Sequence, residues 1–208
     1  MTVRKYHSPR RVDAATRTRE AILSSAYELF MAHGYADVTM GDIAKRASVA
    51  TATVYSSAGN KPAILTALLL PAITDPLIAE HLAAIEASDD PHEVIKLTVR
   101  GTRLTHERHW DLVYGLFYRN PPGEAAVKSV LDRGADDYVQ ALTRVADHLA
   151  KLKALRTGVT AAEALDVLWF FAGPGAWTTL VGQRAWSFER AQEWMTHTAA
   201  QALLRENR

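Results

Sequence analysis

Side chains that can read nucleic acid are concentrated in one short segment of the chain. Thr51, Thr53, Tyr55 and Ser56 place four hydroxyl groups within six residues. Hydroxyls form hydrogen bonds with base edges and phosphates, and the methyl groups of Thr51, Ala52 and Thr53 can contact the methyl of thymine. This chemistry requires the segment to be an exposed helix that enters the major groove, where each base pair presents a distinct pattern of donors and acceptors.

A second set of side chains, rich in aromatic rings, indicates a small-molecule site in the C-terminal part. All five tryptophans lie beyond residue 100, and Trp110, Tyr114, Phe117 and Tyr118 fall on one helical face. Pockets between helices hold ligands with apolar walls and a few polar groups that orient them. The predicted ligand-binding residues are His106, His109, Trp110, Tyr114, Tyr138, Trp169, Phe170 and Trp177. The alternative interpretation is that these rings are ordinary core.

The pattern of residues does not favour a catalytic or metal centre. The chain has no cysteine, which excludes disulfides, thiolate ligands and a thiol nucleophile. His106 and His109 are one residue too close for the His-Glu-x-x-His zinc pattern, and the sequence places no third ligand. Gly173-Pro174-Gly175 matches neither a phosphate-binding loop nor a nucleophile elbow. We therefore expect no enzyme activity, cofactor or metal; the weakest alternative is an all-α hydrolase that uses the two histidines.

The hydroxyl-rich segment falls on the third of three helices predicted near the N-terminus. Apolar spacing predicts a helix over residues 16–33, which Gly34 ends. A short second helix begins at Thr39, whose hydroxyl forms a capping box with Asp42. After a turn at Ser48, a third helix is predicted over residues 51–57. One longer helix followed by two short helices and a tight turn describes a helix-turn-helix.

The rest of the chain is predicted to form longer helices, so the predicted fold class is all-α. The predicted helices span residues 62–70, a stretch up to 87, and 91–106, 107–118, 124–155, 161–183 and 187–205, with a kink at 173–175. The last two helices carry broad apolar faces, which either pair with a second subunit or pack within their own. The predicted domains are a flexible basic arm over 1–14, a helix-turn-helix over 15–61, and an effector-binding and dimerisation domain over 62–208.

Charge is distributed unevenly along the 208 residues, although the net charge is only +1. Residues 1–62 hold nine Lys and Arg against five Asp and Glu, whereas the remainder holds 15 against 18. A basic N-terminal part on a mildly acidic body favours a polyanion as partner of that part; the alternative is a solvated tail. The sequence shows neither a secretory signal nor an apolar run of membrane-spanning length, so we expect a cytoplasmic protein without a membrane partner.

The N-terminal segment resembles the DNA-binding domain of TetR-type transcriptional regulators over about residues 15–65. The resemblance is carried by residues 17–23 (Arg-Thr-Arg-Glu-Ala-Ile-Leu), Ala26, Leu29, Phe30, Gly34, Tyr35, Thr39, Ile43, Ala44, Ala47, Val49, Val54, Tyr55 and Lys61. It implies that Thr39, Tyr55 and Lys61 contact phosphates, and we include Arg17 in the predicted DNA-binding set. Thr39 and Lys61 both stand at predicted helix starts, where free N–H groups favour anions.

Four positions depart from the family's usual pattern. Ser48 stands where a turn glycine is usual, and a serine with positive φ costs roughly 1 kcal/mol. Ala50 replaces the usual serine cap of the third helix. Ser57 and Ala58 replace an aromatic pair. These changes are expected to affect DNA affinity more than the fold.

Together these features predict a homodimeric, ligand-responsive repressor. Its partners would be a palindromic double-stranded operator and a partly apolar small-molecule effector, and dimerisation would use the last two helices. The main alternative is a helical small-molecule-binding protein that does not bind DNA.

Overall fold

The computed structural model describes residues 9–118 and 125–205, and within them it contains only helices and their connections. Contacts divide the chain into two compact units, Met1–Pro71 with Gly115–Val130, and Ala72–Tyr114 with Leu131–Arg208. The predicted all-α class is confirmed. The division falls inside a helix at Pro71, and the predicted domain boundary after residue 61 stays a prediction.

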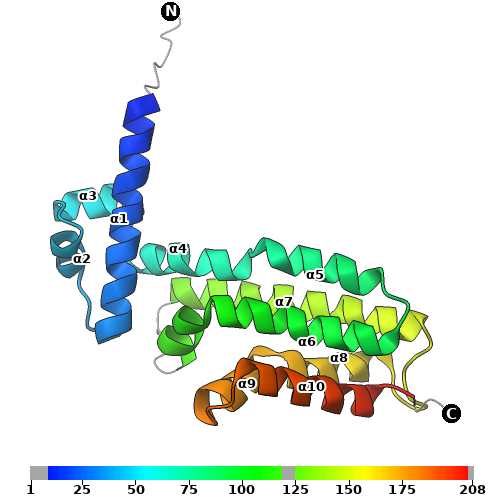
Figure 1. Ribbon diagram of the computed structural model, residues 1–208. Helices are drawn as coiled ribbons and strands as arrows, with labels where there is room; N and C mark the ends of the chain where they lie inside the picture. The colour runs from blue at the N-terminus through cyan, green and yellow to red at the C-terminus, as the bar shows by residue number, and fades with distance from the viewer. Residues whose placement is uncertain (1–8, 119–124, 206–208) are drawn as a thin grey trace, which may run out of the picture. The chain divides into compact units, whose positions relative to one another are not determined.

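The first unit begins with three helices in the predicted order (Figure 1). They are α1 (Pro9–His33), α2 (Met40–Arg46) and α3 (Thr51–Ala58), followed by α4 (Lys61–Ile73). Each of the first three helices buries one face, and these three faces pack together in a small core. The core residues are Ile22, Ala26, Phe30, Ile43, Ala44, Val54 and Ala58. The apolar spacing therefore predicted the helix-turn-helix correctly.

The first helix is longer than predicted. It begins at Pro9, where a first-turn proline is tolerated, and not at Thr16. Residues 12–17 of this helix are exposed, so no apolar stripe marks them and the periodicity could not reveal them. The predicted flexible arm therefore overlaps a helix from residue 9 onward, and residues 1–8 lie outside the described part of the chain.

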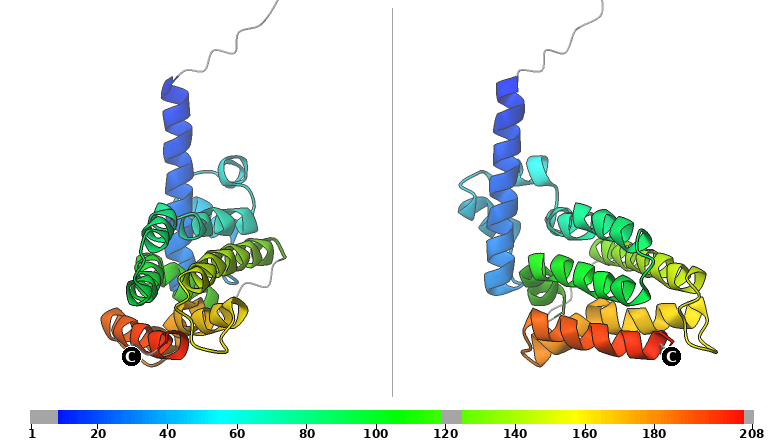
Figure 2. Two further views of the ribbon diagram at one scale, coloured as in Figure 1. Left: turned by 90° about the vertical axis from the view of Figure 1, so that its right-hand side faces the viewer. Right: turned by 45° about the vertical axis from the view of Figure 1, so that its right-hand side comes forward.

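The second unit is a layered helical bundle (Figure 2). Its helices are α5 (Pro76–Glu86), α6 (Pro91–Arg108), α7 (Ala125–Lys151) from Leu131 onward, α8 (Ala161–Ala172), α9 (Pro174–Trp177) and α10 (Phe188–Leu203). The larger core cluster includes Ile95, Leu149 and Leu168, and a second cluster surrounds Trp177 and Met195. Helices α8 and α10 lie side by side.

Two segments of the chain form wide π-helical turns, which the sequence did not reveal. They are η1 (Asp111–Tyr118) and η2 (Thr178–Gln183). The predicted helical segment over 107–118 is confirmed as helical, but α6 ends at Arg108 and a π-helical segment follows. The predicted kink is confirmed at Gly173, which adopts an extended conformation between α8 and α9.

Two apolar helical stretches reach the length of a membrane span, although none was expected from the sequence. By length and composition, residues 61–86 and 161–183 could each cross a membrane. The first stretch is interrupted by a buried, ion-paired Asp75, and the second by Gly173. Their buried residues, such as Ile64, Leu65 and Leu168, lie in the protein core. Of the two apolar windows, 22% and 33% are buried. The absence of a membrane partner therefore stays a prediction.

Candidate functional site

Helix α3 is anchored by its inner face. Val54 and Ala58 are buried in the core that α3 shares with α1 and α2. The helix ends at Gly59, whose φ of +82° is readily available only to glycine. Arg19 of α1 donates a hydrogen bond of 2.6 Å to the carbonyl of Ser57, at the last turn of α3. This contact places a cation at the negative end of the helix and ties α3 to α1.

The outer face of α3 carries the predicted base-reading side chains. Thr51, Ala52, Tyr55 and Ser56 are exposed, and Tyr55 keeps 53% of its surface accessible. Thr53 is only half-buried, so it lies at the edge of this face. The Ser56 hydroxyl donates to the carbonyl of Thr53 at 3.2 Å. The structure thus brings together hydroxyls and methyls on one rigid exposed surface, the α3 outer face.

The turn before α3 shows the departures from the family pattern that were expected at Ser48 and Ala50. Ser48 has a φ of +55°, the left-handed conformation that a glycine would adopt more easily. Ala50 occupies the N-cap of α3 and offers no side-chain hydrogen bond to the free N–H groups. The turn therefore keeps its shape at the cost of local strain and a missing cap.

Thr39 is committed to a capping box at the start of α2. Its hydroxyl accepts from the Asp42 N–H at 3.2 Å, and the Asp42 carboxylate accepts from the Thr39 hydroxyl at 2.6 Å and from the Thr39 N–H at 2.9 Å. Hydrogen bonds from the Thr39 side chain and backbone lower the pKa of Asp42. A phosphate at Thr39 would therefore meet an ionised carboxylate.

Lys61 and Arg17 are already engaged in the first unit. The Lys61 ammonium lies 4.4 Å from the centre of the Tyr35 ring and donates to the Ala36 carbonyl at 3.1 Å. Lys61 is the first residue of α4 and is half-buried. Arg17 is exposed on α1 and donates to the Asp13 carbonyl of its own helix at 3.3 Å. Both cations keep donors available for a phosphate.

Six of the eight predicted ligand-binding residues form one continuous row of rings in the second unit. We call this set, together with Phe188, the aromatic row. Neighbouring ring centres are 4.7 to 6.1 Å apart, which is the normal range for aromatic contacts. In order, the rings belong to Tyr114, Trp110, Phe188, Trp177, His106, Tyr138 and Trp169.

The polar groups of the row are paired with each other and with backbone. The Tyr138 hydroxyl donates to the Ala172 carbonyl at 2.5 Å, and burial raises its pKa. Trp177 donates its indole N–H to the Thr102 hydroxyl at 3.2 Å. His106 contacts the Thr102 carbonyl through Nδ1 at 2.8 Å, and burial lowers its pKa to about 4. The row is therefore mostly apolar and uncharged near pH 7.

His109 and Phe170 do not join the row. His109 lies 3.0 Å from the buried carboxylate of Asp75, which also pairs with Arg108 at 3.1 Å. Burial alone would raise the pKa of Asp75, but hydrogen bonds from Leu77 and His109 and the charge of Arg108 lower it overall. Phe170 is 71% exposed on α8 and contacts Phe171 instead.

Sequence reasoning missed Phe188, Thr102 and Asp75. Phe188 bridges Trp110 and Trp177, and Thr102 binds both His106 and Trp177. Thr102 was detectable in retrospect, because it lies one turn before His106 on α6. Nothing in the local sequence linked Phe188 or Asp75 to residues so far along the chain.

The π-helical segments meet at one end of the row. Tyr114 of η1 lies so close to Gly182 of η2 that any side chain at Gly182 would collide with its ring. Wide π-helical turns are frequent at functional sites. Their position beside the aromatic row supports it as the candidate ligand site.

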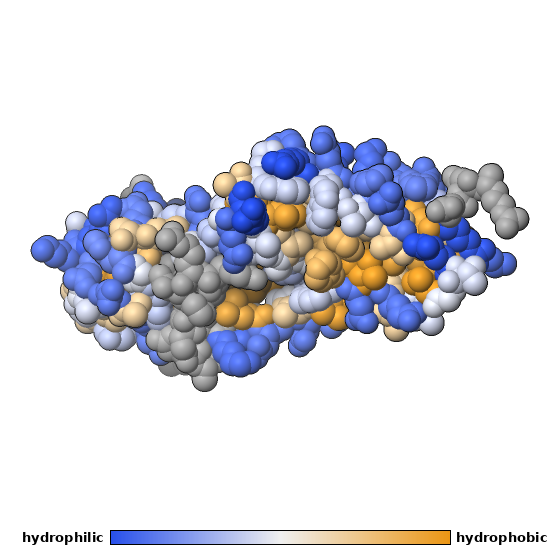
Figure 3. Space-filling view, turned by 90° about the horizontal axis from the view of Figure 1, so that it is seen from below, coloured by the Kyte–Doolittle hydropathy of each residue, from blue (hydrophilic) through white to orange (hydrophobic). Residues whose placement is uncertain are grey.

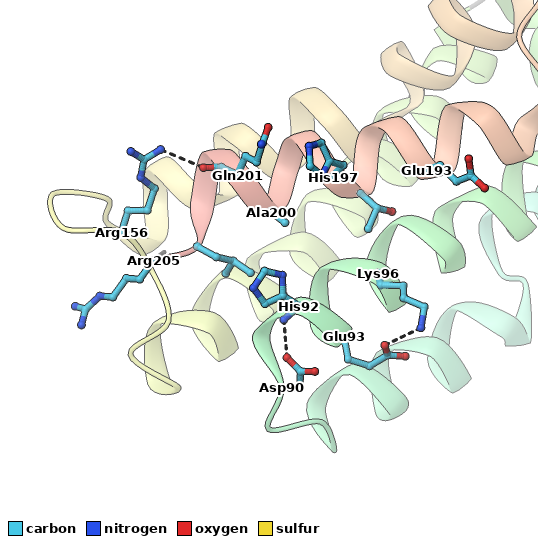
Figure 4. Close-up of a pocket in the computed structure, with 12 residues that line it drawn as sticks. Asp90, His92, Glu93, Lys96, Arg156, Glu193, His197, Ala200, Gln201 and Arg205 are labelled. Atoms are coloured by element: carbon cyan, nitrogen blue, oxygen red, sulfur yellow. Dashed lines mark hydrogen bonds and ion pairs between the residues drawn. The ribbon is translucent and has the colours of Figure 1, made fainter. Parts of the chain in front are cut away.

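A separate hollow of about 760 Å³ lies between the start of α6 and the end of α10 (Figure 4). Its charged side chains are largely satisfied by neighbours, since Lys96 pairs with Glu93 and Arg156 donates to the Gln201 carbonyl. Arg205 donates to the Leu155 carbonyl. This hollow is open and polar, and contains none of the predicted ligand-binding residues.

Comparison with known proteins identifies similarities of two kinds. Residues 22–68 match the model of the family described as bacterial regulatory proteins, tetR family. An uncharacterized HTH-type transcriptional regulator, YdeS of Bacillus subtilis (strain 168), is 43% identical over 60 residues, which cover 29% of this chain and 30% of that protein. The match therefore spans less than a third of that relative.

Solved structures share the fold over nearly the whole chain. NalD of Pseudomonas aeruginosa, described as the secondary repressor of a multidrug efflux pump, has a TM-score of 0.74 at 20% identity, covering 94% of this chain and all of NalD. FadR of Bacillus subtilis, solved in complex with stearoyl-CoA, has a TM-score of 0.69 at 16% identity, covering 88% of this chain and 98% of FadR. At these identities the likeness concerns the fold.

Proposed function

We propose that this chain, whose residues 22–68 belong to the TetR family of bacterial regulatory proteins, is a ligand-responsive repressor of transcription and not an enzyme. The observation that carries the proposal is the α3 outer face: Thr51, Ala52, Tyr55 and Ser56 are exposed on a helix held rigidly by buried Val54 and Ala58. A helix of this size fits the major groove, and these side chains can contact bases and phosphates there.

The phosphate contacts are assigned to side chains that flank α3. Tyr55, Lys61, Thr39 and Arg17 would fix the register of the protein on the duplex, while Thr51, Ala52, Thr53 and Ser56 would read the sequence. Lys61 contributes most clearly, because its ammonium group stands at a helix start. Thr39 contributes less, because Asp42 already occupies its hydroxyl.

The second unit is proposed to bind a partly apolar effector in the aromatic row. The fold is shared with FadR bound to stearoyl-CoA, with SmeT bound to triclosan, and with a regulator from Saccharomonospora viridis bound to choline. The row supplies the apolar walls such ligands need, and His106, Tyr138 and Thr102 supply its polar groups.

A homodimer would present two copies of α3 to a palindromic operator. Apolar side chains gather on the face over α8 and α10 (Figure 3), where Trp169, Phe170 and Trp194 are 39%, 71% and 44% exposed. Two such faces can bury each other as a four-helix arrangement. The two α3 helices must then lie roughly 34–36 Å apart, one turn of DNA.

Effector control requires only a difference in affinity between two states. An effector that binds better to a form with another α3 spacing shifts the population away from the form that binds DNA. We place this regulator in the cytoplasm, where its operator would be.

The test is an electrophoretic shift assay on DNA upstream of the coding sequence at about 0.1 M salt, where exposed charges are screened beyond ~10 Å. Wild-type protein should shift the fragment, and the double variant Thr51→Ala, Ser56→Ala should bind much more weakly. Thr143→Ala, which removes a threonine hydroxyl from the second unit, serves as the matched control and should bind normally. A wild-type chain that binds a hydrophobic ligand but shifts no DNA would instead support the helical binding protein without DNA contact.

A further inference from the structure

The buried imidazole of His106 has one fixed tautomer. Its Nδ1 lies 2.8 Å from the Thr102 carbonyl, and a carbonyl oxygen can only accept a hydrogen bond. Nδ1 therefore carries the proton, and Nε2 presents a lone pair. His106 is only 7% exposed, and burial favours the neutral ring. The site thus offers an acceptor at Nε2.

The donors around His106 are directed to other acceptors. The Tyr138 hydroxyl donates to the Ala172 carbonyl, and the Trp177 indole N–H donates to Thr102. The Thr102 hydroxyl lies 3.0 Å from the Val99 carbonyl, to which it donates. None of the hydrogen bonds found among the described residues reaches Nε2. Nε2 is also not among the fully enclosed polar atoms that lack a partner. This acceptor is therefore accessible, and a ligand that donates to it gains affinity and specificity.

The charges near the row are already balanced. Arg108 and His109 face the carboxylate of Asp75, and Arg103 pairs with Glu107 and Glu189. The neutral imidazole cannot neutralise an anion, and the rings of the row provide no carboxylate for a cation. An anion would lose its hydration without a matching counter-charge, whereas aromatic faces can hold a cation without a carboxylate. The charges around the row therefore disfavour an anionic ligand.

The rings next to His106 select a flat ligand. Trp177 lies nearly parallel to the imidazole, at 26° and 5.9 Å, while Tyr138 meets it edge-on at 69° and 6.1 Å. Such surfaces favour stacking and edge contacts with another ring. We propose that the effector is an aromatic molecule without negative charge that carries a hydroxyl or N–H group, and that this group donates a hydrogen bond to Nε2 of His106. This inference rests on the proposed sensor role of the second unit.

Two probes of the same size test the inference on the full-length chain. 2-Naphthol carries a hydroxyl donor where 2-methylnaphthalene carries a methyl group. Titration calorimetry at pH 7 should show that 2-naphthol binds about tenfold more tightly, the gain expected from one well-made hydrogen bond. A purely hydrophobic site would prefer the methyl compound, so the order of the two affinities is diagnostic.

Variants locate the hydrogen bond. His106→Phe keeps a ring and removes the acceptor, so it should abolish or reverse the preference for 2-naphthol. His197→Phe makes the same change at an exposed position of α10 and should retain the preference. If His106→Phe does not fold, the ¹⁵N resonance of the His106 imidazole in the wild type decides, because 2-naphthol should shift the Nε2 signal and 2-methylnaphthalene should not.

Three results would overturn the inference: equal or reversed affinities in the wild type, a preference that survives in folded His106→Phe, or an unchanged Nε2 signal at saturation with 2-naphthol. Failure of both probes to bind also overturns it. A DNA shift assay on the same preparation keeps the two proposals separate. If the probe preference holds while no DNA is bound, the inference stands and the proposed repressor function fails.

Discussion

Individual side chains of the candidate DNA surface differ in how free they are to act. Tyr55 and Thr51 are exposed, whereas the Lys61 ammonium is held by the Ala36 carbonyl and the Tyr35 ring. Thr39 is held by Asp42. A side chain that already has a hydrogen bond within the protein must give it up to bind a phosphate. It therefore adds to the binding free energy only the difference between the new hydrogen bond and the one it replaces. The residue types predicted the surface, but only the structure shows which groups must exchange a partner on binding.

Lys61→Ala should weaken binding to all duplex sequences alike, because a phosphate contact carries no sequence information. It should also lower the slope of log affinity against log salt by about one unit. Fluorescence anisotropy at several salt concentrations measures both effects. Lys151→Ala, an exposed lysine at the end of α7, is the control. An unchanged slope in Lys61→Ala would remove this residue from the interface.

His106 should make stability depend on pH. Burial lowers its pKa from the usual 6.5 to about 4, so the unfolded chain binds this proton more readily than the folded chain. The stabilisation is complete above pH 6.5 and is lost as the pH falls toward 4, by roughly 3 kcal/mol in all. Urea unfolding of the wild type and His106→Phe from pH 7.5 to 4 tests this. Parallel stability curves for the two proteins would contradict it.

At the scale of elements, the sequence predicted what local signals determine. The start of α2 is set by the Thr39–Asp42 capping box, that of α8 by Thr160 and Glu163, and the break at Gly173 by its proline neighbour. The early start of α1 and the π-helical turns were missed. Exposed helix carries no apolar stripe, and the π-helical segments come together through the contact of Tyr114 with Gly182, which lie far apart in the chain.

Ser48→Gly should stabilise the helix-turn-helix. The serine has a φ of +55°, and glycine removes its steric cost of about 1 kcal/mol, less some loss of chain entropy. Ser56→Gly, inside α3, is the opposite control and should destabilise by about 0.5–1 kcal/mol. Chemical unfolding reports both values. A Ser48→Gly protein that is clearly less stable than wild type would show that the turn is not strained.

At the scale of the whole molecule, the proposed function requires a second copy of the chain. One α3 covers one half-site, and joining two half-sites multiplies affinity. The aromatic row was largely predictable, because rings repeat at helical spacing. The exclusion of His109 and Phe170 from it was not, because His109 pairs with Asp75, 34 residues away, and Phe170 lies exposed on α8.

Phe170→Asp should convert the protein to monomers and lower operator affinity by at least about tenfold, because it buries a charge in the proposed subunit interface. Analytical ultracentrifugation measures the mass and a shift assay the affinity. Val139→Asp, an exposed apolar residue of α7, is the matched control and should leave both unchanged. A dimer that persists in Phe170→Asp would place the interface elsewhere.

The central claim is that α3 reads duplex DNA, and selection from a random pool of double-stranded oligonucleotides tests it most directly. The full-length protein should enrich a palindrome whose half-sites are centred one helical turn apart, roughly 10–10.5 base pairs, or a multiple of this. Thr53→Ala should change the preferred base at one position of each half-site. If no duplex is retained, even at low salt, or if the enriched sequences lack two-fold symmetry, the account is contradicted.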